Sequence, residues 1–114
     1  MKDCVRIGVV GCGAIGHAHL EVWQGIGHAK VTAVCDAVKN RAESMAGEVG
    51  AEPFVDLEEM AASGAVDALD ICTPSGLHGQ QGLIGAKHGR HVLCEKPLDL
   101  KAEVARRLVR ECEA

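Results

Sequence analysis

A glycine-rich turn between two apolar runs, followed by an acid, limits what this chain can fold into. The turn carries three glycines in the pattern G-x-G-x-x-G, which are Gly11, Gly13 and Gly16. It follows the apolar run of residues 5–10, and a second apolar run at residues 31–35 ends at Asp36. Strand, glycine turn, helix, strand and carboxylate in this order are typical of a βαβ unit that binds a dinucleotide.

Each glycine of the turn has its own expected task. Gly11 permits the tight turn, Gly13 lets the backbone approach a pyrophosphate, and Gly16 lets the helix lie close to the strand. The free amides and positive dipole end at the helix start favour an anion. Asp36 is suited to accept hydrogen bonds from a ribose 2′-hydroxyl and to repel a 2′-phosphate, which favours NAD over NADP. Arg41 softens that preference, and the competing interpretation is a glycine turn that binds nothing.

Alternating apolar runs and amphipathic segments predict one α/β domain over residues 1–114. The expected strands are residues 4–10, 30–35, 53–55, 68–72 and 91–94. The expected helices are residues 14–26 and 38–48, a short one capped by Asp56, one from Ser75 to His88, and a last one capped by Asp99. Five short strands with helices between them predict a doubly wound, mostly parallel, Rossmann-like sheet with right-handed crossovers.

The helix faces are also predicted. The first helix is expected to bury Ile15, Val22 and Ile26, and the second to bury Ala42, Met45, Ala46 and Val49. Four glycines recur at every third position of the helix after Ser75, namely Gly76, Gly79, Gly82 and Gly85. Interior glycines each cost a helix about 1 kcal/mol relative to alanine. They indicate either close packing of this helix or a frayed one.

Charge and hydropathy exclude several classes of partner. The formal net charge is −4, and the sequence pI is about 5.8. The one short basic cluster is Arg106, Arg107 and Arg110, and its spacing is typical of the solvated face of a helix. No nucleic-acid partner is therefore expected. No apolar stretch approaches the roughly 18 residues of a membrane span. The first residues lead directly into a strand without a signal-peptide layout, so a cytoplasmic location is expected.

The chain has six cysteines, Cys4, Cys12, Cys35, Cys72, Cys94 and Cys112. Their spacing contains no C-x-x-C pair and no zinc pattern, so no metal site is predicted. Four of them fall at or just beyond the carboxyl ends of expected strands, which cluster in this kind of fold. They are expected to be small buried hydrophobes in a reducing compartment, with a thiol-based redox sensor as the alternative.

Two further motifs lie at the same sheet edge as the glycine turn, where ligands bind in such folds. The first is CTPSGLH at residues 72–78, in which Pro74 stiffens the turn and Thr73 offers a hydroxyl. The second is CEKP at residues 94–97, in which the proline biases Lys96 toward extended geometry. The Lys96 ammonium is then expected to project into the cleft.

The ordered set GCGAIGHAH, Asp36, CTPSGLH and CEKP resembles the Gfo/Idh/MocA (glucose–fructose oxidoreductase/inositol dehydrogenase) family over essentially the whole chain. The resemblance implies an NAD(P)-dependent oxidoreductase acting on sugars, sugar nucleotides or polyols. It implies that the cofactor contacts are Gly11, Cys12, Gly13, Ala14, Ile15, Gly16, Asp36, Thr73, Pro74, His78 and Glu95. It also implies that Lys96 is the catalytic lysine beside the nicotinamide, bound to the reacting oxygen.

The same resemblance implies a second domain that carries the substrate pocket, a further acid/base and the oligomer interface. The sixth Rossmann strand and that domain do not appear in residues 1–114, so a truncated cofactor domain is expected, which binds NAD without turning over. A small sugar-type substrate and a homo-oligomer are expected of the full-length protein. Two alternatives remain: a stand-alone dinucleotide-binding sensor, and a Rossmann-like interaction module without a ligand, against which Asp36 argues.

Overall fold

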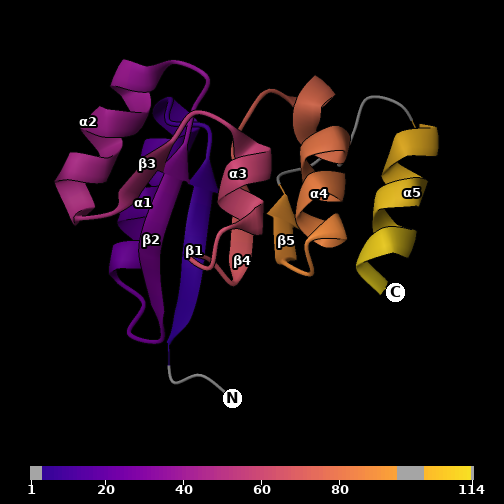
Figure 1. Ribbon diagram of the computed structural model, residues 1–114, viewed down its shortest axis with the longest axis horizontal. Helices are drawn as coiled ribbons and strands as arrows, with labels where there is room; N and C mark the ends of the chain where they lie inside the picture. The colour runs from indigo at the N-terminus through magenta and orange to yellow at the C-terminus, as the bar shows by residue number, and fades with distance from the viewer. Residues whose placement is uncertain (1–3, 95–101, 114) are drawn as a thin grey trace.

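The structure, a computed structural model, describes residues 4–94 and 102–113. Its strands form one parallel sheet in the order β3-β2-β1-β4-β5 (Figure 1). The strands are β1 (Val5–Val10), β2 (Ala29–Cys35), β3 (Glu52–Phe54), β4 (Ala68–Ile71) and β5 (His91–Cys94). The helices are α1 (Ala14–Gln24), α2 (Lys39–Val49), α3 (Leu57–Ala62), the 3₁₀ turn η1 (Ser75–Leu77), α4 (His78–Lys87) and α5 (Ala102–Glu113). The predicted doubly wound α/β fold is confirmed.

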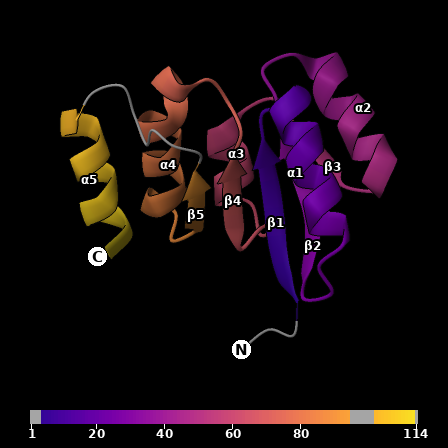
Figure 2. The same ribbon diagram turned by 180° about the vertical axis from the view of Figure 1, so that it is seen from behind.

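Helices cover both faces of the sheet, as the two opposite views show (Figures 1 and 2). One apolar cluster joins the sheet to α1 and α2 and contains Ile7, Val9, Leu20, Val31, Val34 and Met45. The other joins the sheet to α3 and contains Val10, Ala33, Leu57, Met60, Leu69 and Ile71, with Ile84 of α4 packed against it. The neighbours Val9 and Val10 belong to different clusters because successive side chains of a strand point to opposite faces.

The predicted apolar face of α1 is wrong. Ile15, Val22 and Ile26 are 53%, 64% and 40% exposed. The side of the helix that faces the sheet instead carries Gly16, His19, Leu20 and Trp23. Two of these residues, His19 and Trp23, have a polar group at the end of the side chain, and both contact the buried carboxylate of Asp70. These polar contacts stabilise this orientation of the helix together with the burial of Leu20. The helix also ends at Gln24, before Ile26.

The predictions for α2 and α3 are confirmed. Ala42, Met45 and Ala46 are buried, and Gly50 ends α2 in the left-handed conformation with φ of 70°. Asp56 caps α3, because its Oδ1 accepts a hydrogen bond of 2.9 Å from the backbone N–H of Glu58. Such a cap satisfies a helix-start donor and contributes about 1 kcal/mol.

The helix after β4 begins later than predicted. Residues 75–77 form the 3₁₀ turn η1, in which Leu77 N–H bonds to Pro74 O at 2.9 Å, and Leu77 rather than Ser75 stands at the N-cap of α4. The glycine repeat serves close packing. Gly79, Gly82 and Gly85 are buried, and a Cβ built on Gly85 lies 2.7 Å from Leu69 Cδ1. The interior glycines therefore bring α4 close to β4.

The end of the chain lies beside α4, where α5 packs against it (Figures 1 and 2). Arg106, Arg107 and Arg110 are exposed on α5, as expected for a solvated face. The predicted cap at Asp99 lies outside the described residues. At the neighbouring sheet edge, Leu93 of β5 is half exposed. Among the described residues no helix combines the length and the apolar character needed to cross a bilayer.

Candidate functional site

A pocket of about 660 Å³ opens where β1, β2 and β4 end at their carboxyl termini. Five of the residues that the sequence predicts as ligand contacts line it, namely Gly11, Gly13, Asp36, Thr73 and Pro74. They come from three segments that are far apart in the sequence. The parallel sheet brings these segments together because the carboxyl ends of its strands share one edge.

The three glycines of the turn have different surroundings. Gly11 has φ of +99°, and a Cβ there lies 2.9 Å from the backbone carbonyl of Cys72. A Cβ on Gly16 lies 2.0 Å from Gly11 O, so only glycine fits between the helix and the turn. A Cβ on Gly13 meets nothing within 4 Å. Gly11 and Gly16 are thus needed for packing, whereas Gly13 faces open space where a ligand has room to approach.

The start of α1 is suited to an anion. Gly13 is its N-cap residue and offers no side-chain cap, and the first turn contains no acidic residue. The amides of this turn carry the positive end of the helix dipole. A phosphate is the kind of group that satisfies such amides.

Asp36 holds the end of β2 against the glycine turn. Its Oδ2 accepts a hydrogen bond of 2.9 Å from the backbone N–H of Cys12, and its Oδ1 accepts one of 2.8 Å from Val38 N–H. A carboxylate oxygen has more than one acceptor site, so both oxygens can still accept from a ligand hydroxyl. The backbone bonds fix the carboxylate in the pocket wall beside the turn.

Several residues in the pocket wall are not among the predicted contacts. They include Arg41, which the sequence suggested only as an influence on cofactor preference, and four residues that lie within ten positions after the end of a strand, namely Val38, Val55, Leu77 and Gln81. Proximity to a strand's carboxyl end is a signal that would have identified Val38, Val55 and Leu77. Gln81 is one helical turn beyond α4's first residue, and its amide oxygen accepts a hydrogen bond from the Thr73 hydroxyl.

His78 is buried, and its Nε2–H donates a hydrogen bond of 2.6 Å to Thr73 O. It is not among the described residues that line the pocket, and it contacts the Thr73-Pro74 turn through the hydrogen bond to Thr73 O. Ala14 and Ile15 are exposed on the first turn of α1. Glu95 and Lys96 lie outside the described residues, directly after β5.

The thiols of Cys12 and Cys35 are buried beside this pocket. Burial, with the neighbouring Asp36 carboxylate as a further cause, raises the pKa of Cys12 to about 12. Burial, followed by the adjacent Cys12, raises the pKa of Cys35 to about 12 as well. Because the thiolate is the reactive form, both thiols are chemically inert at neutral pH. This argues against the sensor alternative at these two cysteines, and Cys12 takes part in the site through its backbone N–H.

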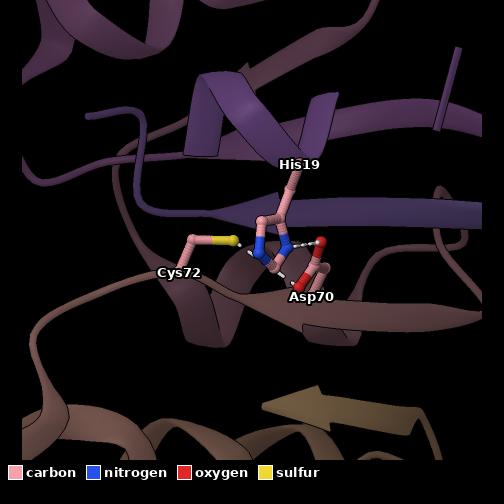
Figure 3. Close-up of side chains that lie close together, drawn as sticks. All are labelled: His19, Asp70 and Cys72. Carbon is pink, nitrogen blue, oxygen red and sulfur yellow. Dashed lines mark hydrogen bonds and ion pairs between the residues drawn. The ribbon is translucent and has the colours of Figure 1, made fainter. Parts of the chain in front are cut away.

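A second group of polar side chains was not predicted, and one of its members, Cys72, also lines the pocket. His19 of α1, Asp70 of β4 and Cys72 just after β4 point toward one another (Figure 3), with their ligand atoms within 4.8 Å of one another. His19 Nδ1 lies 2.8 Å from Asp70 Oδ2, and the two residues are 51 positions apart in the sequence. Asp70 interrupts an otherwise apolar strand, and that lone acid was the available signal.

Comparison with known proteins identifies the family of this chain. The model of the oxidoreductase family with an NAD-binding Rossmann fold (GFO_IDH_MocA) matches residues 5–114. An inositol 2-dehydrogenase from Rhizobium meliloti is 41% identical over 103 residues, which are 90% of this chain and 31% of the relative. A scyllo-inositol 2-dehydrogenase (NADP(+)) from Bacillus subtilis is 40% identical over 82% of this chain and 29% of the relative.

Solved structures of related proteins have the same fold. The WlbA dehydrogenase from Bordetella pertussis, in complex with NADH and UDP-GlcNAcA, is 38% identical with a TM-score of 0.92 over 96% of this chain and 34% of that one. The chain spans about a third of the length of these relatives. Because the family match covers almost the whole chain, this protein belongs to the Gfo/Idh/MocA oxidoreductases and comprises their NAD-binding Rossmann domain.

Proposed function

We propose that the pocket at the carboxyl ends of β1, β2 and β4 binds a nicotinamide dinucleotide, with NAD preferred over NADP. The observation that carries the proposal is the meeting of Gly13, which faces open space at an uncapped helix start, with the fixed carboxylate of Asp36 in one pocket. The first group suits a pyrophosphate and the second suits a ribose diol.

In this proposal, different residues of the pocket bind different parts of the dinucleotide. The amides at the start of α1 hold the pyrophosphate through the open side of Gly13, and Asp36 accepts from the ribose hydroxyls. A 2′-phosphate placed there meets a like charge, which disfavours NADP. Arg41 also lines the pocket and offsets part of this repulsion. Relatives of both cofactor types exist, so the preference rests on Asp36.

The reaction is proposed for the full-length protein, since the chain spans only a third of its relatives. Bound NAD(P) supplies a nicotinamide that accepts or donates hydride. Thr73 and Pro74 form the pocket wall on the β4 side, and His78 braces that turn through Thr73 O. Glu95 contacts the cofactor, and the Lys96 ammonium hydrogen-bonds the reacting oxygen and stabilises its developing charge.

The proposed substrate is a sugar, sugar nucleotide or polyol, in keeping with relatives named for inositol and a solved relative bound to UDP-GlcNAcA. The protein is proposed to act in the cytoplasm as a homo-oligomer. None of its six cysteines forms a disulfide in the described residues, which suits a reducing compartment.

Calorimetric titration with NAD⁺ and NADP⁺ tests the cofactor proposal. We expect the wild-type chain to bind NAD⁺ more tightly. Asp36→Asn should weaken NAD⁺ binding about tenfold or more, the effect of a lost charge-assisted hydrogen bond, and should narrow the preference over NADP⁺. Glu43→Gln removes the same charge from an exposed position of α2 outside the pocket wall and should change neither affinity. Failure of the folded wild-type chain to bind either dinucleotide contradicts the proposal.

A further inference from the structure

Asp70 is the acidic residue that is buried in the described part of the chain. It is 1% exposed, and burying a carboxylate without compensation is costly. Its oxygens contact three groups: Oδ2 accepts from Trp23 Nε1–H at 2.7 Å and lies 2.8 Å from His19 Nδ1, and Oδ1 lies 3.5 Å from Cys72 Sγ. No lysine or arginine of the described residues pairs with it.

The group around Asp70 has the donor set of a borderline divalent metal. Cysteine sulfur, histidine nitrogen and carboxylate oxygen are the protein ligands of Zn²⁺, and the three residues here offer one of each. A thiolate and a carboxylate together carry two negative charges, which a dication neutralises. The cluster with its dication then has no net charge.

The distance between the sulfur of Cys72 and the carboxylate oxygen Oδ1 of Asp70 is that expected for two ligands of a tetrahedral site. Zn–S and Zn–O bonds of about 2.3 and 2.0 Å place sulfur and oxygen about 3.5 Å apart in a tetrahedron. Cys72 Sγ and Asp70 Oδ1 are 3.5 Å apart. His19 Nδ1 lies 2.8 Å from the other carboxylate oxygen, Oδ2, and one ligand atom from each of the three residues lies within 4.8 Å of the other two.

We propose that His19, Asp70 and Cys72 form a binding site for Zn²⁺ or a similar borderline divalent metal, contrary to what the cysteine spacing predicts. Trp23 supports the site from outside, since its indole N–H holds the Asp70 carboxylate in place. Three protein ligands leave a fourth position for water. The metal joins α1 to the end of β4, the two elements that carry the glycine turn and Thr73-Pro74.

Titration of the metal-free chain with Co²⁺, which takes the place of Zn²⁺ and is visible by absorption, tests this proposal. We expect one Co²⁺ per chain, a near-ultraviolet thiolate-to-cobalt band, and loss of that band on adding Zn²⁺. Cys72→Ser should remove the band. Cys35→Ser changes another buried thiol in the same way, outside the cluster, and should leave the band and the stoichiometry unchanged.

Two further variants keep the test decisive if Cys72→Ser fails to fold. His19→Gln retains a hydrogen-bond donor for Asp70 but no imidazole, and it should abolish tight binding. Trp23→Phe should weaken Co²⁺ binding roughly 10- to 100-fold without changing the ligand set. Absence of a thiolate band at equimolar Co²⁺ in folded wild-type chain, or persistence of the band in folded Cys72→Ser or His19→Gln, overturns the proposal.

Discussion

At the scale of single residues, the three glycines of the first turn are one motif in the sequence but two kinds of position in the structure. Gly16 is required by the backbone itself, because a Cβ there lies 2.0 Å from Gly11 O. Gly13 has no protein neighbour within 4 Å of such a Cβ. The pattern G-x-G-x-x-G therefore combines a folding requirement with a ligand requirement, and substitution can separate them.

Alanine substitutions provide that separation. Gly16→Ala should destabilise the fold by about 3 kcal/mol, since the atom it meets is rigid backbone. Gly13→Ala should leave the free energy of unfolding within about 0.5 kcal/mol of wild type, yet weaken NAD⁺ binding. Urea unfolding and calorimetry on both variants check this. Gly47→Ala, in open space on α2, serves as control and should stabilise slightly. Equal stability of the Gly16 and Gly13 variants would contradict this reasoning.

At the scale of elements, α4 shows that a sequence of low helix propensity can form a helix where close packing requires small residues. Its glycines lower helix propensity, but a Cβ at Gly85 lies 2.7 Å from Leu69 Cδ1 and 3.2 Å from Val92 Cγ2. Close packing on β4 and β5 thus outweighs the propensity cost. The sheet beneath the helix therefore determines where α4 lies.

A double-mutant cycle measures this contact. Gly85→Ala should destabilise the protein by about 1–3 kcal/mol through overpacking against Leu69. In a Leu69→Ala background the methyl group has space, so the same substitution should cost much less, giving a coupling of about 1 kcal/mol or more. Additive effects in chemical denaturation would show that Leu69 is not the obstacle.

The helices and strands also show which features of the fold could be predicted from the sequence. Apolar runs and glycine stops predicted every strand to within about two residues, because these signals are local. The buried face of α1 was not predictable from its apolar residues, because Asp70, far along the chain, draws His19 and Trp23 inward. The cluster of His19, Asp70 and Cys72 was not predicted for the same reason, because its members lie close together only in the folded protein. Asp36 and Thr73 were predictable as pocket residues because strand ends mark the site.

At the scale of the whole molecule, the proton balance of the buried thiols links stability to pH. The pKa of Cys12 and that of Cys35 are raised from 9.0 to about 12 in the folded state. A group with a raised folded pKa stabilises the fold below its unfolded pKa, and this contribution is lost as pH rises toward the folded pKa. The loss should therefore begin near pH 9 and continue to about pH 12.

Urea midpoints at pH 7.5 and pH 10 check this linkage. We expect a lower midpoint at pH 10 in the wild-type chain and a smaller decrease in Cys35→Ser, which lacks one of the two titrating thiols. Cys4→Ser, at a partly exposed position just before β1, should keep the wild-type decrease. An unchanged midpoint between the two pH values would mean that these thiols ionise alike in the folded and unfolded chain.

The strand order carries a consequence for how this molecule opens. Strands β3, β2 and β1 are neighbours within the first half of the chain, whereas β4 and β5 join on the other side of β1. The backbone of β1 is thus hydrogen-bonded on both sides, and β5 on one side only within the described sheet. The other edge strand, β3, is also paired on one side only among the described strands. Transient unfolding should therefore start at the edge strands β3 and β5, and β1, which leads into the glycine turn, should exchange its amide protons last.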